Sequence, residues 1–162
     1  MNNNDTLRRL RYALDISNEQ LVAMFALAGQ TVTIEQTLAF MKSEGEEGAK
    51  YCTDDYFGCF LDGLIIDRRG PPPAGKPMPA PSHELSNNAK LKKIRIALNL
   101  HEDVMLATLT AGGHPMSRGE LTALFRKPQH KHYRECGDQV LRKFLKGLTK
   151  RLRPKDEANH PE

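Results

Sequence analysis

Apolar residues recur every three or four positions along most of the chain, the spacing that places side chains on one face of an α-helix. The strongest stripe is formed by Phe57, Phe60, Leu61, Leu64 and Ile65. A later stretch nearly repeats it with Leu141, Phe144, Leu145, Leu148 and Leu152. No segment alternates apolar and polar residues, and no hairpin turn signal occurs. We therefore predict an all-α protein.

Capping signals predict where the shorter helices begin and end. Capping-box pairs precede three of them: Ser17 and Gln20, Thr33 and Gln36, and Ser117 and Glu120. Gly29 stands where a left-handed stop is expected. His101 occupies the place of Ser17 in the later segment, which predicts a weaker cap there. Pro128 is expected to end the helix that follows Ser117.

The chain contains an internal duplication. Residues 3–64 align without a gap with residues 87–148, and 15 of the 62 positions are identical. The sequence therefore predicts two homologous four-helix repeats related by pseudo-twofold symmetry. Residues that both repeats keep are expected to build the fold, whereas residues that only one repeat carries are where function is expected.

A Pro-rich segment divides the chain. We predict helical repeat 1 over residues 1–70, a linker over 71–86, helical repeat 2 over 87–153 and a polar tail over 154–162. Six prolines between Gly70 and Ser86 predict a stiff, extended linker, with a ligand for a proline-reading domain as the alternative. Each repeat alone is marginally large for a stable core, so we expect the two to touch.

Charge is distributed unevenly between the repeats. The chain carries a net charge of +4, but residues 1–70 hold seven Lys or Arg and eleven Asp or Glu, whereas residues 87–153 hold fifteen and five. Either the two repeats complement each other electrostatically, or the basic repeat presents a cationic surface to a partner.

The basic second repeat supplies the candidate binding residues. They are Lys92, Lys93, Arg126, Lys127, Lys131, Arg134, Arg142, Lys146 and Lys150. The last three share one helix face, and the loop over 126–134 places Tyr133 among cations. Such arrays bind phosphate backbones, and an aromatic ring beside them can stack on a base. No motif for sequence-specific readout occurs. The alternative is a solvated helix face that opposes the acidic repeat.

Six residues that both repeats share are predicted to be structural: Arg11, Asp54, Gly63, Arg95, Asp138 and Gly147. The glycines lie inside the most apolar helix, where glycine costs about 1 kcal/mol relative to alanine, so we expect another helix to pass close to them. The aspartates fall in the first turn of that helix, at the positive end of its dipole. Each arginine is hypothesised to pair with the aspartate of its own repeat or to cap carbonyl groups.

Two further kinds of chemistry receive weaker support. His130, His132 and Cys136, with His114 elsewhere, are legitimate zinc ligands, but their spacing matches no strong motif. Cys136 near His132 also suggests a thiol nucleophile. The corresponding Cys52 has no nearby histidine, which favours a buried structural role for both cysteines. We therefore predict no catalytic, cofactor-binding or metal-binding residue, and a protein that is not an enzyme.

The N-terminal segment is polar, so no signal peptide is expected, and no apolar run is long enough to span a membrane. Three cysteines do not make a disulfide framework. These features predict a reduced, cytoplasmic protein.

Three phrases are distinctive together. They are NNxxLRxLRxAL from Asn3, NNxxLKKIRIAL from Asn87 and HKxYRECGDQxLRxFLKGL from His130. On these runs the chain resembles the YehS-like bacterial family (domain of unknown function 1456), over essentially residues 2–153. The resemblance implies a duplicated helical protein of the bacterial cytoplasm, and it supplies no activity, cofactor or catalytic residue.

The leading interpretation is a binding or regulatory protein that holds RNA, DNA or another polyanion on repeat 2. The alternative is a protein–protein adaptor or homodimer that uses the groove between the repeats, and a small metal or thiol enzyme comes third.

Overall fold

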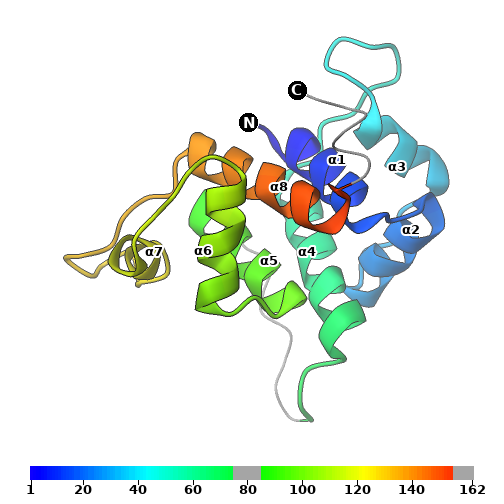
Figure 1. Cartoon of the computed structure of the whole chain (residues 1–162). Helices are drawn as coiled ribbons and strands as arrows, with labels where there is room; N and C mark the ends of the chain where they lie inside the picture. Colours follow the sequence, from blue (N-terminus) through cyan, green and yellow to red (C-terminus); the bar gives the residue numbers. More distant parts are fainter. Residues whose placement is uncertain (75–84, 155–162) are drawn as a thin grey trace.

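The computed structural model describes residues 1–74 and 85–154, and in these ranges the chain forms eight α-helices and no strand (Figure 1). The all-α prediction is confirmed. The first repeat contains α1 (Asn3–Leu14), α2 (Asn18–Leu27), α3 (Ile34–Met41) and α4 (Asp54–Arg69). The second contains α5 (Asn87–Leu98), α6 (Glu102–Ala111), α7 (Arg118–Leu124) and α8 (Asp138–Leu152). Most of the predicted linker and tail, residues 75–84 and 155–162, lies outside the described residues.

The two repeats exchange their packing partners. The long helix α4 packs on α2 of its own repeat and on α5 of the other, and α8 correspondingly packs on α6 and on α1. Because the same exchange occurs in both directions, the repeats are related by pseudo-twofold symmetry. Their buried side chains form one hydrophobic core that includes residues of all eight described helices.

The shared glycines allow α4 and α8 to approach a neighbouring helix very closely. A methyl group added to Gly63 would lie 1.8 Å from the carbonyl oxygen of Met24 on α2. A methyl group on Gly147 would lie 1.8 Å from the carbonyl oxygen of Thr108 on α6. Met24 and Thr108 occupy equivalent positions in the two repeats. The close passage expected from the sequence is therefore present at both sites.

The helix boundaries follow the capping signals with one exception. All three predicted capping boxes form, and Gly29 adopts a φ of 84° at the end of α2. His101 makes no capping hydrogen bond with its side chain. The expectation for Pro128 is wrong, because α7 ends at Leu124. Phe125 leaves the helical conformation, with φ −105° and ψ 4°, and the carbonyl oxygen of Ala123 accepts a hydrogen bond from the backbone N–H of Arg134.

A buried asparagine in each repeat fixes the loop that precedes the long helix. The side-chain amide of Asn4 donates to the carbonyl oxygens of Phe40 at 3.1 Å and Lys50 at 2.7 Å. Its side-chain oxygen accepts a hydrogen bond from the backbone N–H of Cys52 at 2.8 Å. Asn88 makes the same three bonds in the second repeat, at 2.8 to 2.9 Å. These bonds satisfy backbone groups that have no helical partner.

The shared arginines cap carbonyl groups and do not pair with the aspartates. Arg11 donates from Nε to the carbonyl oxygen of Ile16 at 2.9 Å, and Arg95 donates in the same way to Leu100 at 2.9 Å. Each arginine thus holds the tight turn after the first helix of its repeat. Of the two hypotheses drawn from the sequence, the structure shows carbonyl capping.

Candidate functional site

Each shared aspartate begins its long helix and joins the two repeats. Asp54 accepts hydrogen bonds from the side-chain amide of Asn3 at 2.7 Å and from the backbone N–H of Leu85 at 2.9 Å. Partial burial acts to raise the pKa of Asp54, but these two hydrogen bonds and the charge of Lys90 outweigh it, and the pKa is lowered. Leu85 lies two residues before α5, the first helix of the second repeat, so this carboxylate fixes how that repeat enters the fold.

Asp138 makes the equivalent contacts in the second repeat, with one partner from its own repeat and one from the first. It accepts hydrogen bonds from the amino group of Met1 at 2.7 Å and from the side-chain amide of Asn87 at 2.8 Å. These two bonds are the main reason that the pKa of Asp138 is lowered. The two carboxylates are therefore charged at neutral pH, and each holds the start of the opposite repeat.

The lowered pKa values predict acid sensitivity. Because the folded pKa lies below the unfolded value of about 3.9, these groups stabilise the fold above that pH, and the stabilisation is lost as the pH falls through the folded pKa. We expect the double variant Asp54→Asn, Asp138→Asn to be less stable than the wild type at pH 7 and closer to it at pH 3. Urea unfolding at the two pH values measures this. A stability difference that does not change with pH contradicts it.

Lys90 belongs to this structural cluster and not to an open cationic surface, although the sequence places it among the basic residues of repeat 2. Only 7% of Lys90 is exposed, and its amine lies 5.8 Å from the centre of the Phe57 ring. Burial lowers the pKa of Lys90, while the charges of Asp54 and Asp138 act in the opposite direction. The amine thus sits near both carboxylates, where it compensates their charge.

Three of the nine predicted cations meet in one pocket, which we call the cationic pocket. It is a cavity of about 210 Å³ between α5 and the loop that follows α7. Lys92 from α5 lines it together with Arg126 and Lys127 from the loop, and Tyr133 supplies an aromatic ring to the same lining. All three cations are exposed. This arrangement of positive charge around an aromatic ring can hold a phosphate and stack a base.

Polar contacts within the loop and with α7 hold the loop in shape. The guanidinium of Arg126 lies 3.3 Å from Nε2 of His130, and Arg134 forms an ion pair with Glu120 at 3.4 Å. The backbone N–H of Arg134 also donates to the carbonyl oxygen of Ala123 at 3.1 Å. The charge of Arg134 is therefore partly neutralised, although Arg134 is exposed. Lys131 is exposed in the same loop.

The remaining cations lie elsewhere, so the nine residues do not form one continuous site. Lys93 of α5 is ion-paired with Asp62 of α4, and only 22% of its side chain is exposed. At this position the acidic repeat does neutralise the basic one. Arg142, Lys146 and Lys150 are half-buried along α8, and Arg142 donates to the side chain of Gln139 at 2.8 Å. This helix packs against α1 of the first repeat.

A second cation-rich cavity, which was not predicted, lies beside α1 and the residue that follows α8. Arg8 and Arg11 of α1 line it with Tyr12 and with Arg153, in a volume of about 410 Å³. Arg153 donates to the carbonyl oxygen of Tyr12 at 2.8 Å, and its guanidinium lies 4.2 Å from the centre of the Tyr12 ring. The acidic first repeat provides two of these arginines. The net charge of each repeat, taken separately, therefore did not indicate this cavity.

The cysteines are placed where a thiolate is disfavoured. Burial, followed by the charge of the nearby aspartate, raises the pKa of Cys52 to about 12 and that of Cys136 to about 11. The rings of His130 and His132 lie 5.5 Å apart. Within residues 1–74 and 85–154, no group of three or more His, Cys, Asp or Glu is arranged to hold a metal ion.

Among the residues that the structure describes, 1–74 and 85–154, no helix is long and apolar enough to cross a lipid bilayer. The fold and the shared residues define a duplicated, all-helical protein whose repeats exchange packing partners.

Comparison with known proteins identifies the family. The family model described as "Protein of unknown function (DUF1456)" matches residues 3–70 and 87–153, and the chain belongs to this family. The chain is 44% identical over 151 residues to the uncharacterized protein YehS of Escherichia coli strain K12, across 93% of this chain and 96% of that protein. The predicted membership is confirmed. No solved structure matches the chain.

Proposed function

We propose that this protein is a non-enzymatic, cytoplasmic binding protein that holds RNA or DNA through the cationic pocket. The observation that carries the proposal is the meeting of Lys92, Arg126 and Lys127 around Tyr133. Two of these cations come from the loop and one from α5, so their proximity results from folding and is not a consequence of a charge run alone. Phosphate contacts from such residues dominate nucleic-acid affinity.

The pocket favours single-stranded nucleic acid. Tyr133 lines a pocket of about 210 Å³, and a base can stack on it there only when it is unstacked from its neighbours. Binding of this kind is driven by the backbone and by stacking, so we expect weak sequence preference and strong salt dependence.

The test is a double charge reversal in the loop. We expect Arg126→Glu, Lys127→Glu to abolish binding of short labelled single-stranded RNA and DNA that the wild type binds at low salt. If both residues contact phosphates, a milder double change to Gln lowers the slope of log affinity against log salt by about 1.4. Fluorescence anisotropy over a range of salt concentrations measures both effects.

A matched control separates local contact from total charge. Arg68→Glu, Arg69→Glu makes the same change in net charge at two exposed positions in the last turn of α4. We expect this variant to retain binding within severalfold, because it leaves the cationic pocket intact. The proposal fails if the wild type binds neither nucleic acid at low salt, or if both double variants lose affinity equally.

A further inference from the structure

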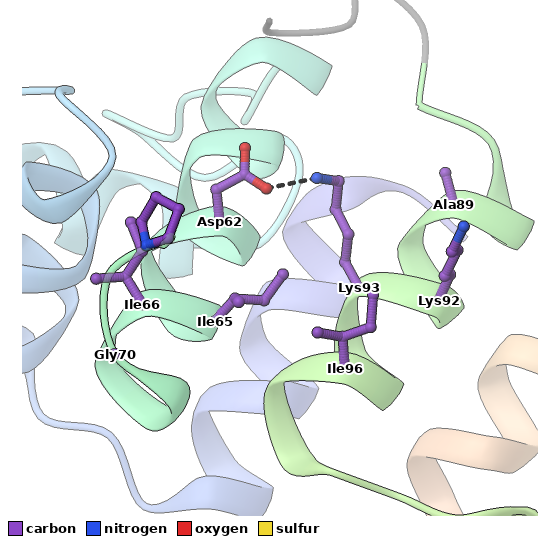
Figure 2. A pocket seen from close by; sticks show the side chains of 9 residues that line it. Asp62, Ile65, Ile66, Gly70, Ala89, Lys92, Lys93 and Ile96 are labelled. Atoms are coloured by element: carbon purple, nitrogen blue, oxygen red, sulfur yellow. Dashed lines mark hydrogen bonds and ion pairs between the residues drawn. The ribbon is translucent and has the colours of Figure 1, made fainter. Parts of the chain in front are cut away.

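An apolar pocket lies between α4 of the first repeat and α5 of the second (Figure 2). Its volume is about 430 Å³, within the range of roughly 300–1,000 Å³ that is usual for small-molecule sites. Ile65 and Ile66 of α4 line one side, and Ile96 of α5 lines the other. Although it faces this cavity, Ile96 is 42% exposed, so apolar surface remains open to solvent.

The charges at the edge of this pocket favour an anion. Asp62 and Lys93 form an ion pair across the gap between the helices, and this pair has no net charge (Figure 2). Lys92 also lines the pocket and is exposed, and the charge that it adds leaves the lining with a net positive charge. A ligand with an apolar body and one negative group complements this arrangement.

The symmetry of the protein shows that the scaffold does not require the apolar lining. The contact of α8 with α1 is equivalent to that of α4 with α5. In α8, Thr149 and Lys150 stand where α4 has its two isoleucines, and Tyr12 of α1 stands in the place of Ile96. The same packing is thus built with polar residues in one case and apolar residues in the other. Of these two equivalent contacts, only the one between α4 and α5 has the apolar lining.

The ends of the pocket limit the size of its occupant. The lining runs along α4 from Asp62 to Gly70, the residue that follows the helix, a length of about 12 Å at 1.5 Å per residue. Gly70 and Pro72, where the chain leaves α4, close one end, and the Asp62–Lys93 ion pair lies toward the other. A continuous helix from a partner would have to pass this turn, whereas a small molecule does not.

We propose that the pocket between α4 and α5 binds a small apolar carboxylate. The alkyl or other apolar body packs between the isoleucines of the two repeats, and the carboxylate pairs with Lys92. The ligand would therefore contact both repeats at once. This pocket adjoins the cationic pocket, with which it shares the lining residues Ala89 and Lys92.

Simple amphiphiles test the proposal. We expect octanoate to bind more tightly than octanol, by up to about fivefold for an exposed ion pair, and octylammonium to bind most weakly. Hexanoate is expected to bind more weakly than octanoate, by up to about fourfold for each methylene group lost. Calorimetry gives the affinities, and methyl NMR of the isoleucines locates the ligand. Absence of any shift at Ile65, Ile66 and Ile96 overturns the proposal, as do equal affinities for all three head groups.

Two matched variants locate the site of octanoate binding. Ile96→Glu places a carboxylate in the lining and is expected to reduce octanoate affinity at least tenfold. Leu38→Glu makes the same change on α3 at a residue of similar exposure, 44%, and is expected to leave the affinity unchanged. If Leu38→Glu weakens octanoate binding as much as Ile96→Glu, the pocket is not the site. Neither variant replaces Lys92, Arg126 or Lys127, and nucleic-acid binding is measured on the same proteins in a separate assay, so the two proposals can fail separately.

Discussion

Replacing Gly63 with alanine should destabilise the fold by about 3 kcal/mol, although alanine is the better helix former. The added methyl group would lie 1.8 Å from the carbonyl oxygen of Met24, and 2.5 Å from the carbonyl carbon. Both are backbone atoms, so no side-chain rotation relieves the clash. Helices α4 and α2 must separate, and the core between them loses contact. Urea unfolding of the variant measures the loss.

The same helix provides the control. Gly58 lies in α4 as well, and a methyl group added there meets no atom within 4 Å. Gly58→Ala is therefore expected to stabilise the protein by up to about 1 kcal/mol through helix propensity alone. If both substitutions shift stability in the same direction, close packing is not the reason for the shared glycine. Gly147→Ala should behave like Gly63→Ala, because its methyl group meets the carbonyl oxygen of Thr108 at the same distance.

Replacing Asn88 with alanine should cost about 3 to 5 kcal/mol, because one side chain satisfies three backbone groups. Two carbonyl oxygens, those of Leu124 and Arg134, lose their donor, and the N–H of Cys136 loses its acceptor. Asn88 itself is 9% exposed, so water cannot easily replace all three bonds. The loop that carries the cationic pocket then loses its attachment to α5. Denaturant unfolding gives the stability change.

A second asparagine serves as the comparison. Asn2 caps α1 near the surface, so Asn2→Ala should cost only about 1 kcal/mol. Asn88→Asp keeps an acceptor for Cys136 but points a carboxylate oxygen at two carbonyl groups, and it should be as damaging as the alanine variant. A cost for Asn88→Ala no larger than that for Asn2→Ala would show that the three buried bonds contribute little.

Much of the architecture could be predicted from the sequence because local patterns encode it. Apolar periodicity, capping pairs and the repeat offset specify the helices and their correspondence. The glycines at 63 and 147 indicated a close approach, and the structure supplies the partner, the carbonyl group of a neighbouring helix. The exchange of α1 and α5 between the repeats could not be predicted, because amphipathic stripes do not specify which stripe they meet.

The candidate site was less predictable, because charge alone does not report geometry. Lys93 is part of the same basic run as Lys92, yet the first is ion-paired with Asp62 and the second lines two pockets. Separating them requires the position of α4 relative to α5. The role of Asn88 was not predicted either. Its identity with Asn4 at the equivalent position of the first repeat did indicate a structural role.

Each repeat depends on the other for part of its helix packing, through the α4–α5 and α1–α8 contacts. A lone repeat would leave its first helix without the long helix of the other repeat, and its own long helix without the first helix of the other, and a second identical copy could supply both. The present chain joins two such repeats covalently, so that each repeat supplies the neighbour that the other lacks. Within one chain the two halves need not be identical, so the two equivalent interfaces can carry different side chains, as the α4–α5 and α1–α8 contacts do.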